Sequence, residues 1–214
     1  LTFSDSVLQA CVQSQAIEYG YIKASDMVSL NCGGMAISDI NDINQLHALE
    51  EVHFDNVTTI TDFTPLASLT ALHSLQAWDA GFDDADFASF AGHQKIEHFG
   101  IGGNVMTTIA AAANMPKLRS LHVWGDGVFD LSVLANLASF DTLALGAAQV
   151  LEINDLLSLS SLTHLWLNNN LTNAEFNVVM QLEGLIHLSL SWNDYLDNDK
   201  LAQIIQNMPQ LQEL

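Results

Sequence analysis

Basic residues are scarce in this chain of 214 residues, which has five Lys and Arg against 25 Asp and Glu. The resulting formal net charge of −20 would repel a phosphate backbone, so we expect no nucleic-acid partner. The acidity has two interpretations. It either keeps a solvated surface soluble or attracts a cationic partner or divalent ions.

Long hydrophobic runs are also lacking. No run approaches the roughly 18 uncharged apolar residues that a membrane span needs, so the sequence predicts no span in this chain. The chain starts at Leu1 without a signal-peptide pattern, and we expect any signal peptide to have been removed or left out of this sequence. The hydrophobic share of 49% is nevertheless ample for a continuous core.

Catalytic signatures are missing as well. The sequence contains no G-x-S-x-G, no H-E-x-x-H and no phosphate-binding loop, and the Gly-Gly pairs at 33–34 and 102–103 are typical of strand-end turns. We therefore predict that the protein is not an enzyme and has no cofactor and no bound metal.

What the chain does contain is a repeated leucine pattern. Residues 162–170 read LxxLxLxxN, in which a short strand buries its leucines and exposes the residues between them. The pattern recurs with steps of 22 (from 27 to 49) up to 26 residues (from 185 to 211), which is the period of leucine-rich repeats. The first positions are Met27, Leu49, Leu72, Ile96, Leu118, Phe140, Leu162, Leu185 and Leu211.

This period predicts an α/β fold, a right-handed leucine-rich repeat solenoid whose parallel β-sheet lines the concave side. We expect an N-terminal helical cap over residues 1–24 and an array of about nine strands over 25–214, with the last repeat incomplete. On the convex side, the early segments are too short for more than 3₁₀ turns, whereas segments starting at Asn173 and Asn198 predict α-helices. The Ala-rich run 107–116 also predicts a helix, ending before Pro116.

The two cysteines fall at the junction of cap and array. Residues 3–18 predict an amphipathic helix, with Ser4 or Asp5 as its N-cap, that places Cys11 on the stripe covering the first repeat. Cys32 takes an inward position of the first strand. The pair forms either a disulfide, which would contribute about 3 kcal/mol, or two buried free thiols. We favour the disulfide, and with it an extracytoplasmic compartment.

One segment resembles a known family. Residues 60–72, ITDFTPLASLTAL, resemble the convex half of a bacterial internalin-type repeat, and the opening FSDSVLQACV, followed by Leu30 and Cys32, resembles the N-terminal cap of secreted or lipoprotein leucine-rich repeat proteins of Gram-negative bacteria. The resemblance implies the solenoid architecture and a secreted or cell-surface location. Because only Pro65 occupies the Pro-Leu position, it implies no particular receptor.

The exposed strand positions collect an unusual set of residues. If positions one, four and six of each repeat point inward, positions three, five and seven form the concave face. Grouped Trp on such a face is typical of a contact surface, so we predict that it binds a protein or carbohydrate ligand. The alternative is a structural spacer that displays another domain. The predicted contact residues are Trp78, Trp124, Trp166, His53, His98, His122, His164 and His187.

Two tryptophans of this face are expected two strands apart. Trp78 and Trp124 share one column with Gly102 between them, which places their rings roughly 10 Å apart. Either a slot lies between the rings over a floor of Gly100 and Gly102, able to admit a sugar ring or a side chain, or the rings fold over the glycines and fill it.

Two groups of residues could hold a metal ion. His164, His187 and Glu213 follow one another in one column, where they form either a zinc site or, as we favour, a polar ladder. The loop clusters 83–86 and 194–199 are rich in Asp and suggest either calcium or helix N-capping. Neither has the spacing of a calcium loop, so we favour capping.

Overall fold

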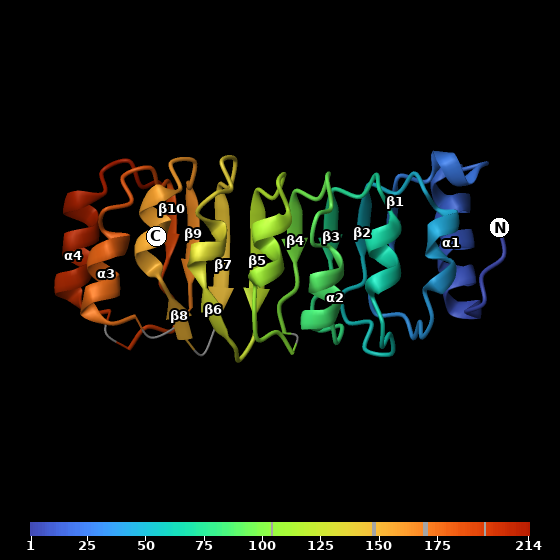
Figure 1. Ribbon diagram of the computed structural model, residues 1–214, viewed down its shortest axis with the longest axis horizontal. Helices are drawn as coiled ribbons and strands as arrows, with labels where there is room; N and C mark the ends of the chain where they lie inside the picture. Colours follow the sequence, from blue (N-terminus) through green and yellow to red (C-terminus); the bar gives the residue numbers. More distant parts are fainter. Residues whose placement is uncertain (104, 147–148, 169–170, 195) are drawn as a thin grey trace.

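A parallel β-sheet of eight strands forms one side of the molecule (Figure 1). The computed structural model describes residues 1–214 except 104, 147–148, 169–170 and 195. The eight strands lie in the sheet in chain order, and β6 and β8 form a separate sheet. The eight are β1 (Ser29–Asn31), β2 (Glu51–His53), β3 (Ser74–Gln76), β4 (His98–Gly100), β5 (Ser120–Trp124), β7 (Thr142–Gly146), β9 (His164–Leu167) and β10 (His187–Ser189).

The register of the sheet follows the leucine pattern without a slip. Leu30 pairs with Val52, and at the far end Leu188 pairs with Leu165, so the same repeat position lies side by side along the array. These inward side chains are fully buried. The right-handed leucine-rich repeat fold predicted from the period is confirmed. The ninth copy contributes one isolated bridge, between Glu213 and His187, and Asn170 of the LxxLxLxxN motif lies outside the described residues.

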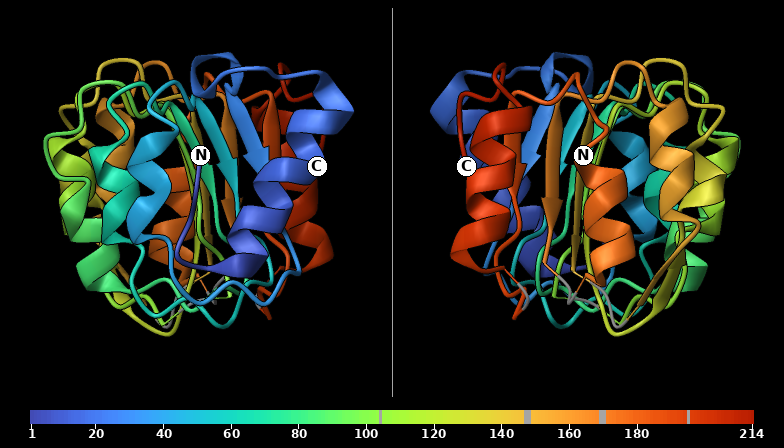
Figure 2. Two further views of the ribbon diagram at one scale, coloured as in Figure 1. Left: turned by 90° about the vertical axis from the view of Figure 1, so that its right-hand side faces the viewer. Right: turned by 90° about the vertical axis from the view of Figure 1, so that its left-hand side faces the viewer.

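Short helices cover the other side of the sheet (Figure 2). The elements are η1 (Ala24–Asp26), η2 (Asn41–Gln45), η3 (Thr64–Ser68), α2 (Asp84–Ser89), η4 (Ala110–Asn114), η5 (Leu131–Leu134), η6 (Ile153–Ser158), α3 (Asn173–Val179) and α4 (Asn198–Asn207). The early segments η2 and η3 are 3₁₀ helices, as predicted, whereas α2 is an α-helix that was not predicted. The two late α-helices were predicted.

The convex side departs from the sequence predictions in two further places. The Ala-rich run 107–116 forms only the 3₁₀ helix η4, because Ile109 and Met115 at its ends must both reach the core within one repeat. A second parallel sheet, of β6 (Val128–Asp130) and β8 (Gln149–Leu151), was not predicted. It lies in the turns between the main strands and η5 and η6, where neighbouring repeats of equal length run alongside each other.

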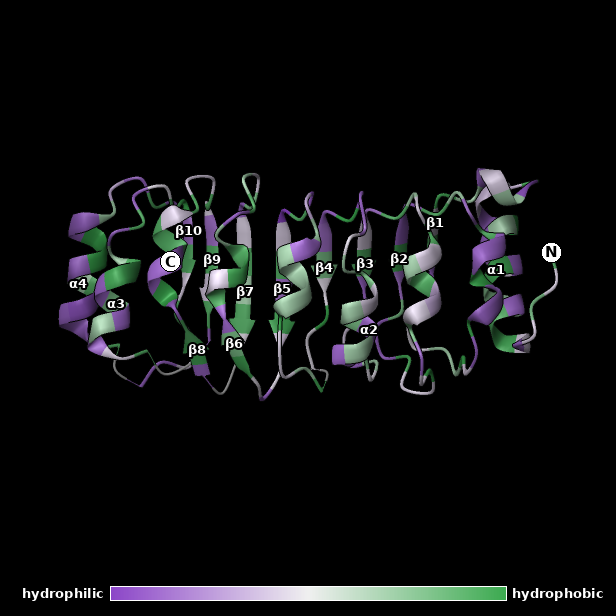
Figure 3. Ribbon diagram, viewed as in Figure 1, coloured by the Kyte–Doolittle hydropathy of each residue, from purple (hydrophilic) through white to green (hydrophobic). Residues whose placement is uncertain are grey.

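The helix α1 (Ser6–Tyr19) closes the N-terminal end of the array, opposite α4 (Figure 1). Both end helices combine hydrophobic and hydrophilic residues (Figure 3), so each can cover a core on one side and face solvent on the other. Asp5 is the N-cap, accepting hydrogen bonds from the backbone of Val7 and Leu8, and Gly20 ends the helix in a left-handed conformation.

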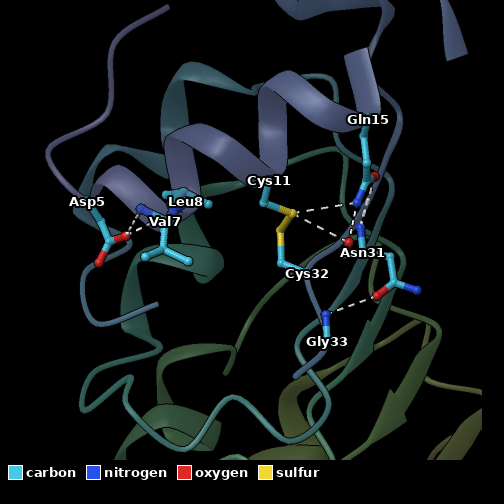
Figure 4. The surroundings of a disulfide bond; sticks show 8 residues. All are labelled: Asp5, Val7, Leu8, Cys11, Gln15, Asn31, Cys32 and Gly33. Carbon is cyan, nitrogen blue, oxygen red and sulfur yellow. Dashed lines mark hydrogen bonds between the residues drawn. A yellow bond between two sulfur atoms is a disulfide. The ribbon is translucent and has the colours of Figure 1, made fainter. Parts of the chain in front are cut away.

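A disulfide joins α1 to the end of β1 (Figure 4). Cys11 and Cys32 have a Cα–Cα distance of 5.9 Å, and both are buried. The predicted pairing is therefore confirmed. Beside it, the Gln15 side chain pairs with the open edge of β1, accepting from the Asn31 N–H at 3.1 Å and donating to the Asn31 carbonyl (Figure 4). The cap thus satisfies a strand edge that would otherwise stay unpaired.

Candidate functional site

The sheet brings six of the eight predicted contact residues into one connected row of rings. Trp78 contacts Trp124 and His122, His122 contacts Trp166, and Trp166 contacts His164 and His187. Ring centroids in these pairs are 4.2 to 6.3 Å apart. We call this row the aromatic strip, and it comprises Trp78, His122, Trp124, Trp166, His164 and His187.

The register of the strands explains the row. His187 lies beside His164, and Trp166 lies beside Ala144, whose small side chain leaves space for neighbouring rings. His122 in turn lies beside Ala144 on the other flank. Each ring of the strip is half-buried, because its neighbours cover one side and leave the other open to solvent.

The slot expected between Trp78 and Trp124 is filled by the rings themselves. Their centroids lie 5.2 Å apart, so the expected spacing of roughly 10 Å is wrong. A Cβ atom built on Gly102 would come within 2.1 Å of Trp78 and 2.9 Å of Trp124, and one on Gly146 within 2.2 Å of Trp124. The two glycines therefore let the indoles lie directly on the backbone, and the surface offers a ring platform in place of a slot.

The centre of the strip has an altered protonation equilibrium. Burial lowers the pKa of His122 below the ordinary 6.5, and the nearby His98 lowers it further, because a second positive charge there is unfavourable. The His122 imidazole, surrounded by the rings of Trp78, Trp124 and Trp166, is therefore neutral at pH 7.

The C-terminal end of the strip is a polar ladder. His187 Nδ1 lies 2.7 Å from Glu213 Oε2, and the His187 and His164 rings stack with centroids 6.0 Å apart. His164 Nδ1 in turn lies 2.9 Å from the Thr163 hydroxyl. Within the described residues, no group of three or more His, Cys, Asp or Glu side chains is arranged to hold a metal ion.

Each acidic loop cluster contributes one helix N-cap, and Asp84 accepts instead from Thr107 and Thr108 of the next repeat. Asp83 accepts from the first backbone N–H groups of α2, and Asp86, which is buried, accepts from the backbone of Phe63 and Asp83. Burial raises the pKa of Asp86, and its backbone hydrogen bonds oppose that rise. Asp197 caps α4 in the same way. The capping interpretation of these Asp residues is supported.

Three aromatic side chains lie outside the aromatic strip. His53 and His98 lie on the predicted face, but their rings contact no ring of the strip in the described structure. Trp192 was not predicted as a contact residue, although its side chain is 84% exposed. It follows β10 at position eight of its repeat. The alternation of strand faces assigns only positions three, five and seven to the exposed face, so this position was left out. The signal available in the sequence was a bulky residue where the other repeats have Gly, Asn, Asp or Ala.

Comparisons with known proteins bear on the fold. No protein-family model matches the chain, and no curated protein matches it. Among solved structures, internalin C2 of Listeria monocytogenes is 22% identical, with a TM-score of 0.77, over 99% of this chain and 93% of that one. An internalin (inlF) of the same organism is 26% identical, with a TM-score of 0.67, over 83% of this chain. The chain has the leucine-rich repeat fold.

The matched proteins differ in length. The chain spans about half of the inlF chain, 51% by coverage. A more distant structure, the Arabidopsis receptor kinase HAESA, is described in complex with the peptide hormone IDA and the co-receptor SERK1; it is 16% identical, with a TM-score of 0.52, over 79% of this chain and 35% of that one. In the part of the chain that the structure describes, no helix is long and apolar enough to cross a membrane.

Proposed function

We propose that this leucine-rich repeat protein is a non-enzymatic recognition module that binds a protein or glycan partner through the aromatic strip on its concave face. The observation that carries the proposal is the connected row of six rings on the exposed side of the sheet. A face that only had to remain solvated would not need three half-exposed indoles in contact with imidazoles.

The packing of the strip favours binding. Indoles and imidazoles have few rotatable bonds, and here each ring is held by its neighbours, while Trp78 and Trp124 also lie on glycine backbone. A surface that is ordered before the partner arrives loses little conformational entropy on binding. Trp is also enriched among residues that contribute most to binding energy, because it combines a large apolar area with one polar N–H.

Two further observations support a partner outside the cytoplasm. The disulfide between Cys11 and Cys32 is typical of proteins that fold in oxidising compartments. The resemblance to internalin repeats suggests a secreted or cell-surface protein, and the HAESA complex is one example of a protein of this fold that binds a peptide. We accordingly propose a secreted or surface-exposed bacterial protein.

Alanine at both Trp78 and Trp124 tests the proposal. We expect binding of the purified protein to an extract of cell-surface proteins and glycans to fall, with an unchanged far-ultraviolet circular dichroism spectrum. The matched control replaces Ile17 and Ile22, two exposed residues at the N-terminal end, with alanine. Unchanged binding by the Trp78 and Trp124 variant would instead favour a structural spacer.

A further inference from the structure

Position eight of the repeat mostly has a left-handed backbone. Of the six described residues there, five have a positive φ, between 50° and 72°, and Gly125 does not. Gly and, less readily, Asn and Asp adopt this conformation, whereas a bulky L-residue clashes with its own carbonyl oxygen. Four of the five fit this rule and the fifth does not: Gly34, Asn56, Asp79, Gly103 and Trp192.

Trp192 gains no packing in return for this strain. Its side chain is 84% exposed and contacts no other ring among the described residues. The turn is nevertheless fixed, because the Asn193 side chain donates to the carbonyls of Leu190 and Leu167 and accepts from the Leu171 N–H at 2.8 Å. A rigid turn thus holds an indole in solvent at a cost to stability, which is a pattern associated with function.

The indole lies at one particular edge of the sheet. Trp192 follows β10, Trp124 ends β5 and Trp78 follows β3, and the carboxyl ends of parallel strands meet at the same edge. Trp124 and Trp192 are three strand spacings apart, or about 14 Å. This edge is the lower one in Figure 1, where the arrowheads of β5 and β7 point.

The two edges of the sheet differ in charge. At the carboxyl edge, none of the five Lys and Arg residues lies in the turns that directly follow the strands, whereas Asp55, Asp126 and Asp194 do. Three of the five, Lys95, Lys117 and Arg119, instead precede β4 and β5 at the opposite edge. Lys200, in the first turn of α4, lines a small pocket with Asn193 and lies 3.6 Å from the Asp197 carboxylate, so this cation is already paired. An edge that combines indoles with carboxylates suits a further cationic group, because the face of an indole attracts positive charge.

We infer that the carboxyl edge of the sheet binds an arginine-bearing peptide segment of the partner, and that Trp192 stacks on one guanidinium. Arginine fits better than lysine, since a planar guanidinium stacks on an indole while its N–H groups still donate to carboxylates. The inference rests on the proposed function, because it extends the same binding surface past the aromatic strip and names the chemistry of the partner.

The test uses a capped hexa-arginine peptide with the full chain, with hexa-lysine for comparison. Asn replaces Trp192, since Asn accepts the left-handed backbone and leaves the net charge unchanged. We expect this variant to bind hexa-arginine about 2- to 5-fold more weakly than the original chain. We also expect its melting temperature to rise by about 2–4 °C, because the strain is removed. Ile22→Asn, which changes an equally exposed apolar residue at the N-terminal end, should leave the affinity unchanged.

Nuclear magnetic resonance locates the contact. The four Trp residues give four indole N–H signals, and the signal missing in the Trp192→Asn variant is that of Trp192. It should shift on titration with hexa-arginine, and less with hexa-lysine. A signal that stays in place while the peptide binds, an unchanged affinity of the variant, or a lower melting temperature would overturn the inference. The proposed function would still stand if alanine at Trp78 and Trp124 abolished binding to the cell-surface extract.

Discussion

Trp78 lies directly on the backbone of Gly102, where a methyl group would come within 2.1 Å of the indole. Because Gly102 does not have a positive φ, alanine is allowed by the backbone there, and any effect of the change arises from the rings. The pairing of Trp78 with Trp124 therefore depends on the absence of a side chain one strand away.

Gly102→Ala should push both indoles off the sheet. We expect a loss of about 1–3 kcal/mol in the free energy of unfolding, as for other overpacked sites, and a changed near-ultraviolet circular dichroism spectrum. The matched control is Gly184→Ala, whose new methyl group would meet a single atom, the Leu162 carbonyl oxygen, at 3.2 Å. Equal spectra for the Gly102 variant and the original chain would show that the rings do not rest on this glycine.

The disulfide should contribute strongly to the stability of the cap. Replacing both Cys11 and Cys32 with alanine should lower the free energy of unfolding by about 3 kcal/mol, because the bond closes a loop of 21 residues in the unfolded chain. Urea denaturation measures the loss. Intact mass under non-reducing conditions provides the independent check, and a mass with two free thiols would contradict the bond.

His122 should make stability depend on pH. Its folded pKa lies below the ordinary 6.5, so the unfolded chain takes up a proton before the folded chain does. The stabilisation of the fold by neutral His122 is therefore fully present above pH 6.5 and is lost as the pH falls from there towards the lowered folded pKa. His122→Gln should weaken the decline in urea midpoint between about pH 7.5 and 5.5. The same decline in both proteins would show that other groups cause it.

The Asp5 carboxylate should stabilise the packing of the N-terminal helix α1 on the array. Burial raises its pKa, but hydrogen bonds from the backbone and hydroxyl of Ser38 and from Leu8 and Val7 outweigh that effect and lower the pKa to about 2. The stabilisation is thus present above 3.8, the ordinary pKa, and is lost as the pH falls towards 2.

Asp5→Ala should therefore cost about 1 kcal/mol of unfolding free energy at neutral pH, which is typical of a lost N-cap. The measurement is urea denaturation at pH 7 and again at low pH, where the difference from the original chain should shrink. Ser6→Ala, at the first exposed position of α1, serves as the control and should have little effect.

The sequence determined those parts of the structure that depend on period and on local chemistry. The leucine spacing specified strand positions and register, so that His164 was predicted beside His187 and the structure places it there. Asp5 and Gly20 specified the ends of α1, because an N-cap acceptor and a left-handed C-terminal residue are local requirements. The division into a cap of residues 1–24 and an array of 25–214 stays a prediction.

The parts that were missed depend on how side chains pack across repeats. Strand spacing fixes where the backbones of Trp78 and Trp124 lie, but the side-chain torsions that bring their rings to 5.2 Å follow from Gly102 and Gly146. The left-handed Trp192 follows from hydrogen bonds that Asn193 makes to the preceding repeat. Neither can be derived from a single repeat read alone.

The bond between Cys11 and Cys32 also has a mechanical consequence. If the protein is pulled by its two ends, the residues between the cysteines cannot extend, so about 70 Å of contour length stays hidden until the bond is reduced. The repeats that follow Cys32 would extend instead, losing their neighbours one after another.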